Sequence, residues 1–375
     1  MTRESALTPP IPDRAVPPST AATGSTGTAA ERDGRGATLD AVAREAGVSR
    51  ATVSRVVNGS PKVSAEVRRV VERAVAKLGY IPNPAARSLV TRRSDSVGLV
   101  ITEPAGRLFE DPFFPRLLRG ISAELSAHGL QLVLLMPEDD DAEQRLERYL
   151  AAGHVDGVVL VSLHGDDPLP AHLQARRVPM VVGGRPPAGV TASYVDVDNR
   201  EAARSAVRHL AGLGRRRIAT IAGPQDMGAG VDRLEGYREG LADARLPADD
   251  DLVAIADFTS EGGATAMRRL LETAPDLDAV FAASDLMAAG ALNVLRAAGR
   301  AVPDDIAIVG FDDSPLAAAT EPPLTSVRQP IEEMGRELVR LLVASLEDAG
   351  RPARRVLLST ELVQRRSSAG GGAQR

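Results

Sequence analysis

A short segment of arginines and small polar residues, SRATVSRVVN (49–58), holds the residue types that recognise DNA bases. At helical spacing Ala51, Arg55 and Asn58 share one face, and Arg50 lies beside them at the amino-terminal end. An arginine guanidinium can make two parallel hydrogen bonds to a guanine, and residues at this end of a recognition helix reach base edges in the major groove. We therefore expect these four residues to contact DNA.

Short hydroxyl side chains stand at the helix starts around this segment. Thr38, Ser49 and Thr52 are suited to phosphate oxygens, contacts that position a protein on a duplex without reading its sequence. Thr38 and Ser49 are also placed to cap helices, because a side-chain oxygen there accepts from a free backbone N–H.

The pattern around these residues predicts three short helices. Apolar residues recur at helical spacing in 39–46, 50–58 and 64–80, and the last helix should stop at Gly79. A tight turn at 47–49 lets the first two helices cross closely, which is the arrangement of a helix-turn-helix. The alternative is ordinary three-helix packing with no partner.

The distribution of charge favours a polyanionic partner for this block. Residues 37–93 hold eleven Lys and Arg against four Asp and Glu, a net charge of +7. Residues 1–36 hold four of each, so residues 94–375 carry 30 basic and 42 acidic residues, or −12. A basic excess confined to one block indicates nucleic acid, although a merely solvated helical face would also carry charge.

The segment NPAARSLVTRR (83–93) could fold only with help. Residues 85–90 favour a helix, yet isolated helices shorter than about 12–15 residues are marginal in water. Two copies packed over a duplex could order it, with Leu89 inserted as a wedge from the minor groove and Ala86 and Arg87 close to the backbone. Such a conditional helix would act as a switch. The alternative is an inert linker whose leucine packs on the neighbouring domain.

The rest of the chain divides into a polar extension and an alternating region. Residues 1–36 are rich in Pro, Ser, Thr, Gly and Ala, and we expect them to be disordered. From Ser96 onward short apolar runs alternate with amphipathic helices, which predicts an α/β fold of parallel sheets covered on both faces. The predicted strands are 97–102, 130–136, 156–162, 179–184, 217–223, 279–284 and 306–313, and the clearest helices are 115–129, 201–214 and 285–299. A break near 193–199 favours two doubly wound lobes, whose ligands would bind outside the carboxyl ends of the strands.

Several classes of protein are disfavoured by what the chain lacks. Its longest apolar runs are too short to cross a bilayer, and its first residues contain no apolar signal-peptide core. Zero cysteines exclude disulfides, thiol catalysis and cysteine-ligated metals. The five histidines are scattered and common catalytic motifs are missing, so we expect no enzyme activity, no metal and no cofactor. SLHGDD (162–167) is interpreted as a polar loop after a strand.

Residues 38–100, beginning TLDAVAREAGVSRATVSRVVNGSPKVS, closely resemble the amino-terminal region of the LacI/GalR family of bacterial transcriptional regulators. The resemblance covers roughly residues 37–366 and continues through FFPRLLRGI, DGVVLVS, VDVDNREAARSAVRHLAGLG, RLEGYREGL, ASDLMAAGAL, DDIAIVGFDD and PPLTSVRQPIEEMG. It implies a homodimeric repressor that binds a pseudo-palindromic DNA operator, with a ligand domain similar to periplasmic sugar-binding proteins.

The resemblance also implies how the chain is divided. It should cross three times between the lobes, the last time after TSVRQP (325–330), so that each lobe is discontinuous. The expected parts are a disordered extension (1–36), a helix-turn-helix domain (37–82), a hinge helix (83–93), a ligand-binding and dimerisation domain (94–367) and a disordered tail (368–375). Lobe 1 should comprise about 94–196 and 328–352, and lobe 2 about 197–325 and 353–367.

Seven residues match ligand-contacting positions of the family. They are Phe113, Phe114, Arg185, Arg233, Phe258, Asp312 and, at the rim of the cleft, Asp285. Arginine and aspartate can hydrogen-bond to sugar hydroxyls, and an aromatic ring can cover the apolar face of a sugar, so a carbohydrate is the expected ligand. For the three phenylalanines the alternative is plain core packing.

Two departures from the family pattern bear on the expected ligand and on the expected oligomeric state. Met227 stands where purine-binding members have an arginine, which disfavours a purine ligand, and the carboxyl terminus lacks the leucine heptads of tetrameric members, which favours a dimer. We therefore expect a cytoplasmic, nucleoid-associated repressor of sugar uptake or catabolism genes. The alternatives are a solute-binding protein, which would need an export signal, and an enzyme with a regulatory head.

Overall fold

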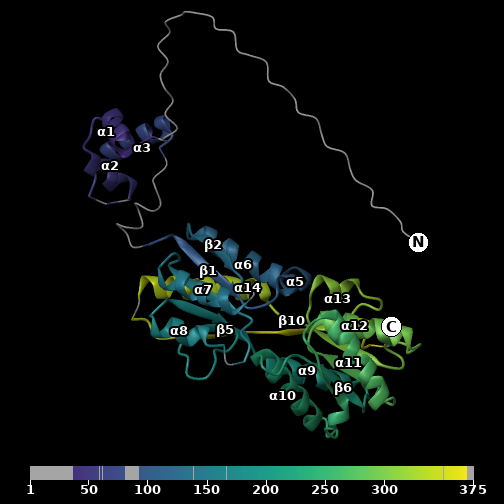
Figure 1. Ribbon diagram of the computed structural model, residues 1–375. Helices are drawn as coiled ribbons and strands as arrows, with labels where there is room; N and C mark the ends of the chain where they lie inside the picture. Colours follow the sequence, from purple (N-terminus) through teal and green to yellow (C-terminus); the bar gives the residue numbers. More distant parts are fainter. Residues whose placement is uncertain are drawn as a thin grey trace, which may run out of the picture. The chain divides into compact units, whose positions relative to one another are not determined.

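The computed structural model describes residues 37–58, 60, 62–80, 93–137, 139–165, 167–348 and 350–369. Three segments lie outside this part of the chain: the expected amino-terminal extension, most of the expected hinge helix and the last six residues. The hinge residues Ala86, Arg87 and Leu89 are therefore outside the described residues. The chain divides after Asn83 into two compact units, and Figure 1 labels helices of the first and both helices and strands of the second.

The described part of the amino-terminal unit is a bundle of three helices. They are α1 (Leu39–Ala46), α2 (Arg50–Val57) and α3 (Ala65–Leu78), each within two residues of the predicted bounds. The Thr38 hydroxyl accepts from the amide of Ala41 at 3.2 Å, and the Ser49 hydroxyl accepts from the amide of Thr52 at 3.1 Å. Gly79 ends α3 with a left-handed φ of 59°. Both predicted caps and the predicted stop are therefore confirmed.

One valine from each of these helices is fully buried. Val42, Val53 and Val71 meet in a core that Tyr80 closes after the end of α3. Because this core fixes the rotation of α2 about its own axis, it determines which α2 side chains face outward.

The first lobe of the second unit is a parallel sheet of six strands in the order β11-β5-β4-β3-β1-β2. The strands are β1 (Ser96–Ile101), β2 (Gln131–Leu135), β3 (Gly157–Val161), β4 (Met180–Gly183), β5 (Ser193–Val197) and β11 (Arg355–Leu358). Its helices are α5 (Ala105–Glu110), α6 (Phe113–Ala127), α7 (Asp140–Ala151), α8 (Leu169–Ala175) and α14 (Ile331–Glu347). Side chains of α6 and α14 form the core on one face of the sheet, and those of α7 and α8 form the core on the other face.

The second lobe repeats this architecture with the strand order β12-β10-β9-β8-β6-β7. Its strands are β6 (Ile218–Ala222), β7 (Val253–Ile255), β8 (Ala279–Ala282), β9 (Ala307–Asp312), β10 (Thr325–Arg328) and β12 (Glu361–Val363). Its helices are α9 (Asn199–Gly212), α10 (Gly228–Asp243), the short 3-10 helix η1 (Asp250–Leu252), α11 (Ser260–Thr273), α12 (Asp285–Ala297) and α13 (Pro315–Ala319). The sheet is parallel except for β12, which pairs antiparallel with β10 at the edge. Helices α9 and α10 cover one face, and α11 and α12 cover the other.

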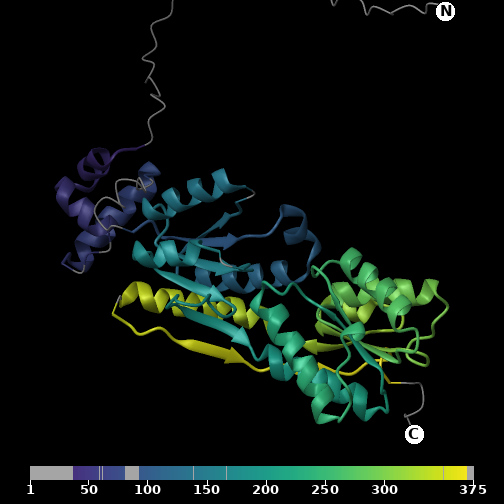
Figure 2. The same ribbon diagram turned by 60° about the horizontal axis from the view of Figure 1, so that its bottom comes forward.

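Within residues 93–369 the chain passes between the lobes three times, after β5, after β10 and after β11. Figure 2 shows the yellow carboxyl-terminal strands running from the first lobe into the second. The expected return at residue 353 is wrong, because β11 pairs with β5 and packs the half-buried Val356 and Leu358 against the core of the first lobe. The last crossing therefore follows Leu358.

The carboxyl-terminal boundary also differs from the expectation. Ser368, which was placed in the disordered tail, is only 2% exposed. Its hydroxyl lies 2.7 Å from Thr325 Oγ1 and 2.9 Å from His209 Nε2, so the second lobe extends at least to this residue. In the described ranges no helix is both long and apolar enough to cross a membrane.

Helices α6 and α14 approach each other so closely that glycine is required at residue 120. A Cβ atom on Gly120 would lie 2.0 Å from the carbonyl oxygen of Glu332. We expect Gly120→Ala to lower the free energy of unfolding by about 1–3 kcal/mol, because the two helices must separate. Gly212→Ala, at the end of α9 with no atom within 4 Å of the added carbon, is the matched control and should be neutral or stabilising. Urea unfolding followed by circular dichroism measures both, and equal midpoints would contradict the prediction.

Candidate nucleic-acid surface and ligand cleft

The outward face of α2 presents the residues that were expected to contact bases. Arg50, Ala51 and Arg55 are exposed, and Asn58 at the end of the helix is half-buried. The fully buried Val53 lies on the opposite face, so core packing rather than a polar contact sets this orientation.

The polar groups around α2 are largely available to a partner. The nearest carboxylate to Arg50 is Asp40, 3.8 Å from its Nε, and both side chains are strongly exposed, so this ion pair is weak. The hydroxyls of Ser49 and Thr52 lie 2.9 Å apart at the start of the helix. Exposed guanidinium and hydroxyl donors thus stand together at the amino-terminal end of α2, as phosphate and base contacts require.

A cavity of about 130 Å³ lies between the two lobes of the second unit, at the carboxyl ends of their strands. Its wall includes six of the seven expected ligand-contacting residues, Phe113, Phe114, Arg185, Arg233, Phe258 and Asp312. Loops from both sheets meet here because parallel strands of one sheet end at the same edge. Phe114 is in addition a core residue of the first lobe and Phe258 one of the second, so for these two rings the packing alternative also holds.

Arg233 is the central polar group of the cavity. It is 5% exposed, and its guanidinium lies 3.7 Å above the ring of Phe311. Its Nε donates to Asn199 Oδ1 at 2.8 Å, and its Nη1 donates to the carbonyl oxygen of Ala283 at 2.6 Å. Asp312 Oδ1 lies 3.9 Å from the same Nη1. Burial lowers the pKa of Arg233, and the neighbouring carboxylates oppose that shift.

Three carboxylates line the cavity beside this arginine. Burial raises the pKa of Asp312, and repulsion from Asp285 and Asp111 adds to a rise that Arg233 only partly offsets. Burial also raises the pKa of Asp196 to about 6 and raises the pKa of Asp111. Each charged carboxylate therefore lacks the solvation it would have in water, and hydrogen-bond donors from a ligand would supply it.

The backbone at the cavity is strained. Ser162, Phe258, Asp312 and Asp313 have φ values of 60°, 64°, 104° and 46°, in the region that favours glycine. Such conformations cost on the order of 1–3 kcal/mol each and persist where the surroundings determine them. At Asp312 the surroundings include Gln329, whose Nε2 donates to Oδ1 at 2.6 Å. Three of these four residues, Ser162, Phe258 and Asp312, line the cavity, and Asp313 directly follows Asp312.

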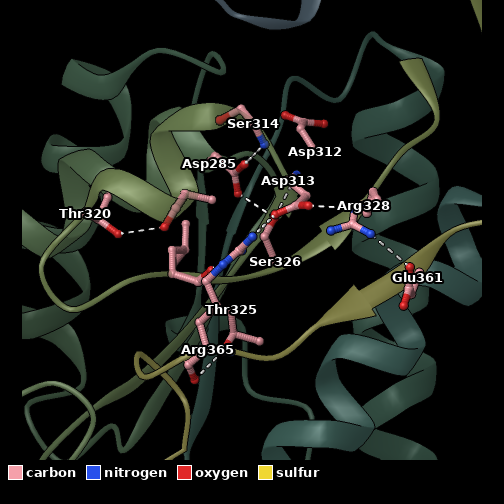
Figure 3. Close-up of polar contacts among 12 residues, drawn as sticks. Asp285, Asp312, Asp313, Ser314, Thr320, Thr325, Ser326, Arg328, Glu361 and Arg365 are labelled. Carbon is pink, nitrogen blue, oxygen red and sulfur yellow. Dashed lines mark hydrogen bonds and ion pairs between the residues drawn. The ribbon is translucent and has the colours of Figure 1, made fainter. Parts of the chain in front are cut away.

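Asp285 does not lie at the rim of the cleft, which corrects the expectation. Its side chain is 1% exposed and does not line the cavity. Figure 3 shows that it instead accepts from the amide of Ser314 at 2.7 Å and from the hydroxyl of Ser326 at 2.6 Å. The reason is that a buried carboxylate at the start of α12 needs donors, and the loop after β9 and strand β10 each provide one. Asp285 thus holds in place the loop that directly follows Asp312.

Among the residues of the cavity wall that sequence reasoning missed are Arg107, Asp111, Asp196, Asn199 and Gln329. Polarity at the carboxyl end of a strand was the available signal for Asp196, Asn199 and Gln329, which lie in or just after β5 and β10. Arg107 comes from α5, a short helix that the apolar pattern did not reveal.

A helix-turn-helix unit with exposed arginines and a two-lobed domain around a polar cavity together define a ligand-responsive DNA-binding protein. Comparison with known proteins identifies the family. Residues 38–83 match the model of bacterial regulatory proteins of the lacI family, and residues 207–368 match that of a periplasmic binding protein-like domain.

Related proteins match over nearly their whole lengths. The chain is 54% identical over 333 residues to the HTH-type transcriptional regulator CelR of Thermobifida fusca, which covers 88% of this chain and 98% of that protein. It matches the solved CelR–cellobiose complex with a TM-score of 0.71 and 52% identity, over 88% of this chain and 99% of that one. It matches the lac repressor dimer bound to operator and the anti-inducer ONPF with a TM-score of 0.77 and 29% identity, over 89% and 99%. The chain therefore belongs to the LacI family.

As a member of this family the protein is a DNA-binding transcriptional regulator controlled by a ligand, and not an enzyme. The expected family, fold class and general function are thereby confirmed.

The raised pKa of Asp196 predicts a pH-dependent effect of Asp196→Asn. The pKa of Asp196 is about 6 in the folded state, whereas its usual value is 3.8. Between about pH 4 and pH 6 the Asp196 carboxyl therefore keeps its proton in the native state and has lost it in the unfolded chain. The contribution of this group to stability therefore falls as pH rises from about 4 to 6. We expect Asp196→Asn to raise the Tm of the ligand-free protein by about 2–4 °C at pH 7.5 and to leave it unchanged near pH 4.

Differential scanning fluorimetry at the two pH values measures this effect. Asp304→Asn, which neutralises an exposed aspartate in the same lobe as Arg233, is the control and should leave Tm unchanged at both. A Tm of Asp196→Asn at pH 7.5 no higher than that of the control would contradict the prediction.

Proposed function

We propose that the protein represses genes for sugar uptake or catabolism, and that a neutral carbohydrate in the cleft controls its affinity for a pseudo-palindromic operator. The observation that carries this proposal is the charge of the cavity wall. Among the described residues the wall holds three arginines, Arg107, Arg185 and Arg233, and three aspartates, Asp111, Asp196 and Asp312, so basic and acidic side chains are equal in number.

Each of these arginines already has a partner. Arg107 Nη1 lies 2.7 Å from Glu103, Arg185 Nη2 lies 2.8 Å from Asp232, and Arg233 is held as described above. An anionic ligand would have to displace these partners, whereas the buried carboxylates need hydrogen-bond donors. Sugar hydroxyls are such donors, and the phenylalanine rings can cover the apolar face of a sugar.

The shape of the cleft favours a disaccharide over a single sugar ring. An outer cavity of about 460 Å³ adjoins the inner one, and the two share Arg107, Asp111 and Phe258 in their walls. One sugar ring can occupy the inner cavity, and a second sugar ring can occupy the outer cavity beside Phe258. The relative CelR was solved with cellobiose, and that chain is 52% identical to this one. Cellobiose is therefore the first candidate effector.

The same proposal assigns the DNA contacts. Base edges would be read by Arg50, Ala51, Arg55 and Asn58, and phosphates would be held by Thr38, Ser49 and Thr52. Residues 83–93 would be the hinge that orders on the operator, with Leu89 as the wedge and Ala86 and Arg87 beside the backbone. A two-fold operator requires two copies, so the protein would act as a homodimer, in the cytoplasm and at the nucleoid.

Thermal unfolding with a panel of sugars tests the effector. We expect cellobiose to raise the Tm of the full chain, because a ligand that binds only the folded state stabilises it by about 2.7 kcal/mol at a hundred times its Kd. Maltose, glucose and glucose 6-phosphate should raise it less. Asp312→Asn should abolish the cellobiose shift, and Asp304→Asn should retain it. A shift with glucose 6-phosphate but not with cellobiose would overturn the neutral disaccharide, and no shift with any sugar would overturn the carbohydrate effector.

Selection from a random duplex pool tests the DNA contacts. We expect the full chain to enrich an inverted repeat, and cellobiose to change its affinity for that duplex at least about fivefold. Arg55→Ala should weaken binding by about 1–3 kcal/mol and relax the preference at one position of each half-site. Lys77→Ala removes the same charge from α3, where Lys77 pairs with Glu45, and should leave the preference unchanged. Fluorescence anisotropy measures both, and sequence-independent binding by the wild type would refute the assignment.

A further inference from the structure

A buried carboxylate organises the mouth of the cleft on the side of the first lobe. Glu103, which follows β1, is 4% exposed, and a single oxygen, Oε1, has three donors around it. These are Arg107 Nη1 at 2.7 Å, the Ser162 hydroxyl at 2.5 Å and His164 Nε2 at 3.0 Å. The strained φ of Ser162 belongs to the loop that brings both Ser162 and His164 to this carboxylate.

The other nitrogen of the same histidine reaches the second lobe. His164 Nδ1 lies 2.9 Å from Asp226 Oδ2, and Asp226 is in the loop between β6 and α10. The amide of Gly165 donates to the carbonyl oxygen of Asp226 at 2.8 Å, which keeps the two loops in register. A ring with a carboxylate at each nitrogen can donate to both only as the imidazolium, because a neutral ring presents a lone pair to one of them.

The charges around His164 agree with this protonation state. The hydrogen bond to Glu103 raises the pKa of His164, Asp226 raises it further, and partial burial opposes them. The hydrogen bond from His164 lowers the pKa of Asp226 in return. The outer cavity around the ring also contains Glu110, Asp111 and Asp257, against the single cation Arg107.

Two other polar contacts between the lobes are made by arginines, whose charge does not change near neutral pH. Arg185 pairs with Asp232, and Arg116 donates to the carbonyl oxygens of Asp312 and Asp313 at 3.2 and 3.4 Å. Arginine stays protonated in proteins, whereas the ordinary titration of histidine falls between pH 5 and 8. His164 also lines the outer cavity together with Arg107 and Phe258, both of which line the inner one.

We propose that Glu103, His164 and Asp226 form an interlobe latch in which His164 is a positioning residue: its imidazolium joins the two carboxylates and holds the lobes closed around the effector. The latch is complete below the unperturbed pKa of histidine, near 6.5, and is lost as pH rises through the raised folded-state pKa of His164. Effector affinity consequently falls with rising pH. The latch proposal rests on the proposed function only for the identity of the effector.

Titration of the ligand-free full chain by NMR tests the bridge itself. The ring signals of His164 are identified as those present in the spectrum of the wild type and missing from the spectrum of His164→Gln. We expect their midpoint to lie above 6.5 in the wild type and to move down in Asp226→Asn, which removes the partner from the second lobe. His172→Gln is the control, because His172 pairs with Glu147 inside the first lobe. A wild-type midpoint at or below 6.5, or one that Asp226→Asn leaves unchanged, would overturn the latch.

Calorimetric titration with cellobiose at pH 6.0 and 8.5 tests the effect on binding. We expect the wild type and His172→Gln to bind about three- to tenfold more weakly at pH 8.5 than at pH 6.0. His164→Gln and Asp226→Asn should bind weakly at both pH values, and the double variant should be no weaker than either. The same pH dependence in wild type and His164→Gln would overturn the proposal.

Failure of the effector assignment can be told apart from failure of the latch. If cellobiose binds none of these proteins, the proposed effector is wrong, and closure is then measured without ligand. Because the chain has no cysteine, spin labels can be attached through Ala171→Cys on α8 and Ala242→Cys on α10, both exposed sites. The distance between the labels should lengthen at pH 8.5 in the wild type and be long at both pH values in His164→Gln. An unchanged distance in both proteins would overturn the latch.

Discussion

Arg233 is a guanidinium buried at the junction of two sheets, and the cleft depends on how its charge is satisfied. Its hydrogen bonds tie the start of α9 and the end of β8 to α10, and its charge lies close to the carboxylate at the end of β9. Removing one partner from a buried charge of this kind typically costs about 3–5 kcal/mol, because the remaining charge has no compensation. The residues around Arg233 are therefore held in one arrangement, which is the condition for recognising a small polar ligand.

The contacts between the lobes are of a different kind. None of the hydrophobic core clusters formed by the described residues spans both lobes, since each sheet has its own core on each face. The lobes are joined by three crossings and by polar contacts at the mouth, such as Arg185 with Asp232, which water can reach. Rigid lobes with a polar junction can change their relative position without disturbing a core, so a ligand that contacts both lobes can shift the balance between arrangements.

The two units also differ in charge in a way that suits their roles. The basic excess of the chain lies in residues 37–93, while residues 94–375 are acidic. An acidic ligand domain is repelled by the phosphate backbone, so attraction to DNA is confined to the helix-turn-helix unit and its linker. The proposed effector cleft can therefore carry carboxylates such as Asp196 and Asp312, because it does not have to attract the nucleic acid.

The sequence by itself determined the three helices of the amino-terminal unit and the strands that are continuous apolar runs, because these elements depend on nearby residues. The caps at Thr38 and Ser49, the stop at Gly79 and the seven strands that are apolar runs follow from local periodicity and local hydrogen bonding, whereas β5, β7, β10, β11 and β12 were not predicted from it. Family resemblance, rather than periodicity, placed Arg233 and Phe258 in the cleft. Only the tertiary structure decided that β11 stays in the first lobe, that Asp285 faces inward and that His164 meets Asp226, which is 62 residues away. These outcomes depend on which donors lie next to which acceptors once the two sheets are packed, and no local pattern of polar and apolar residues contains that information.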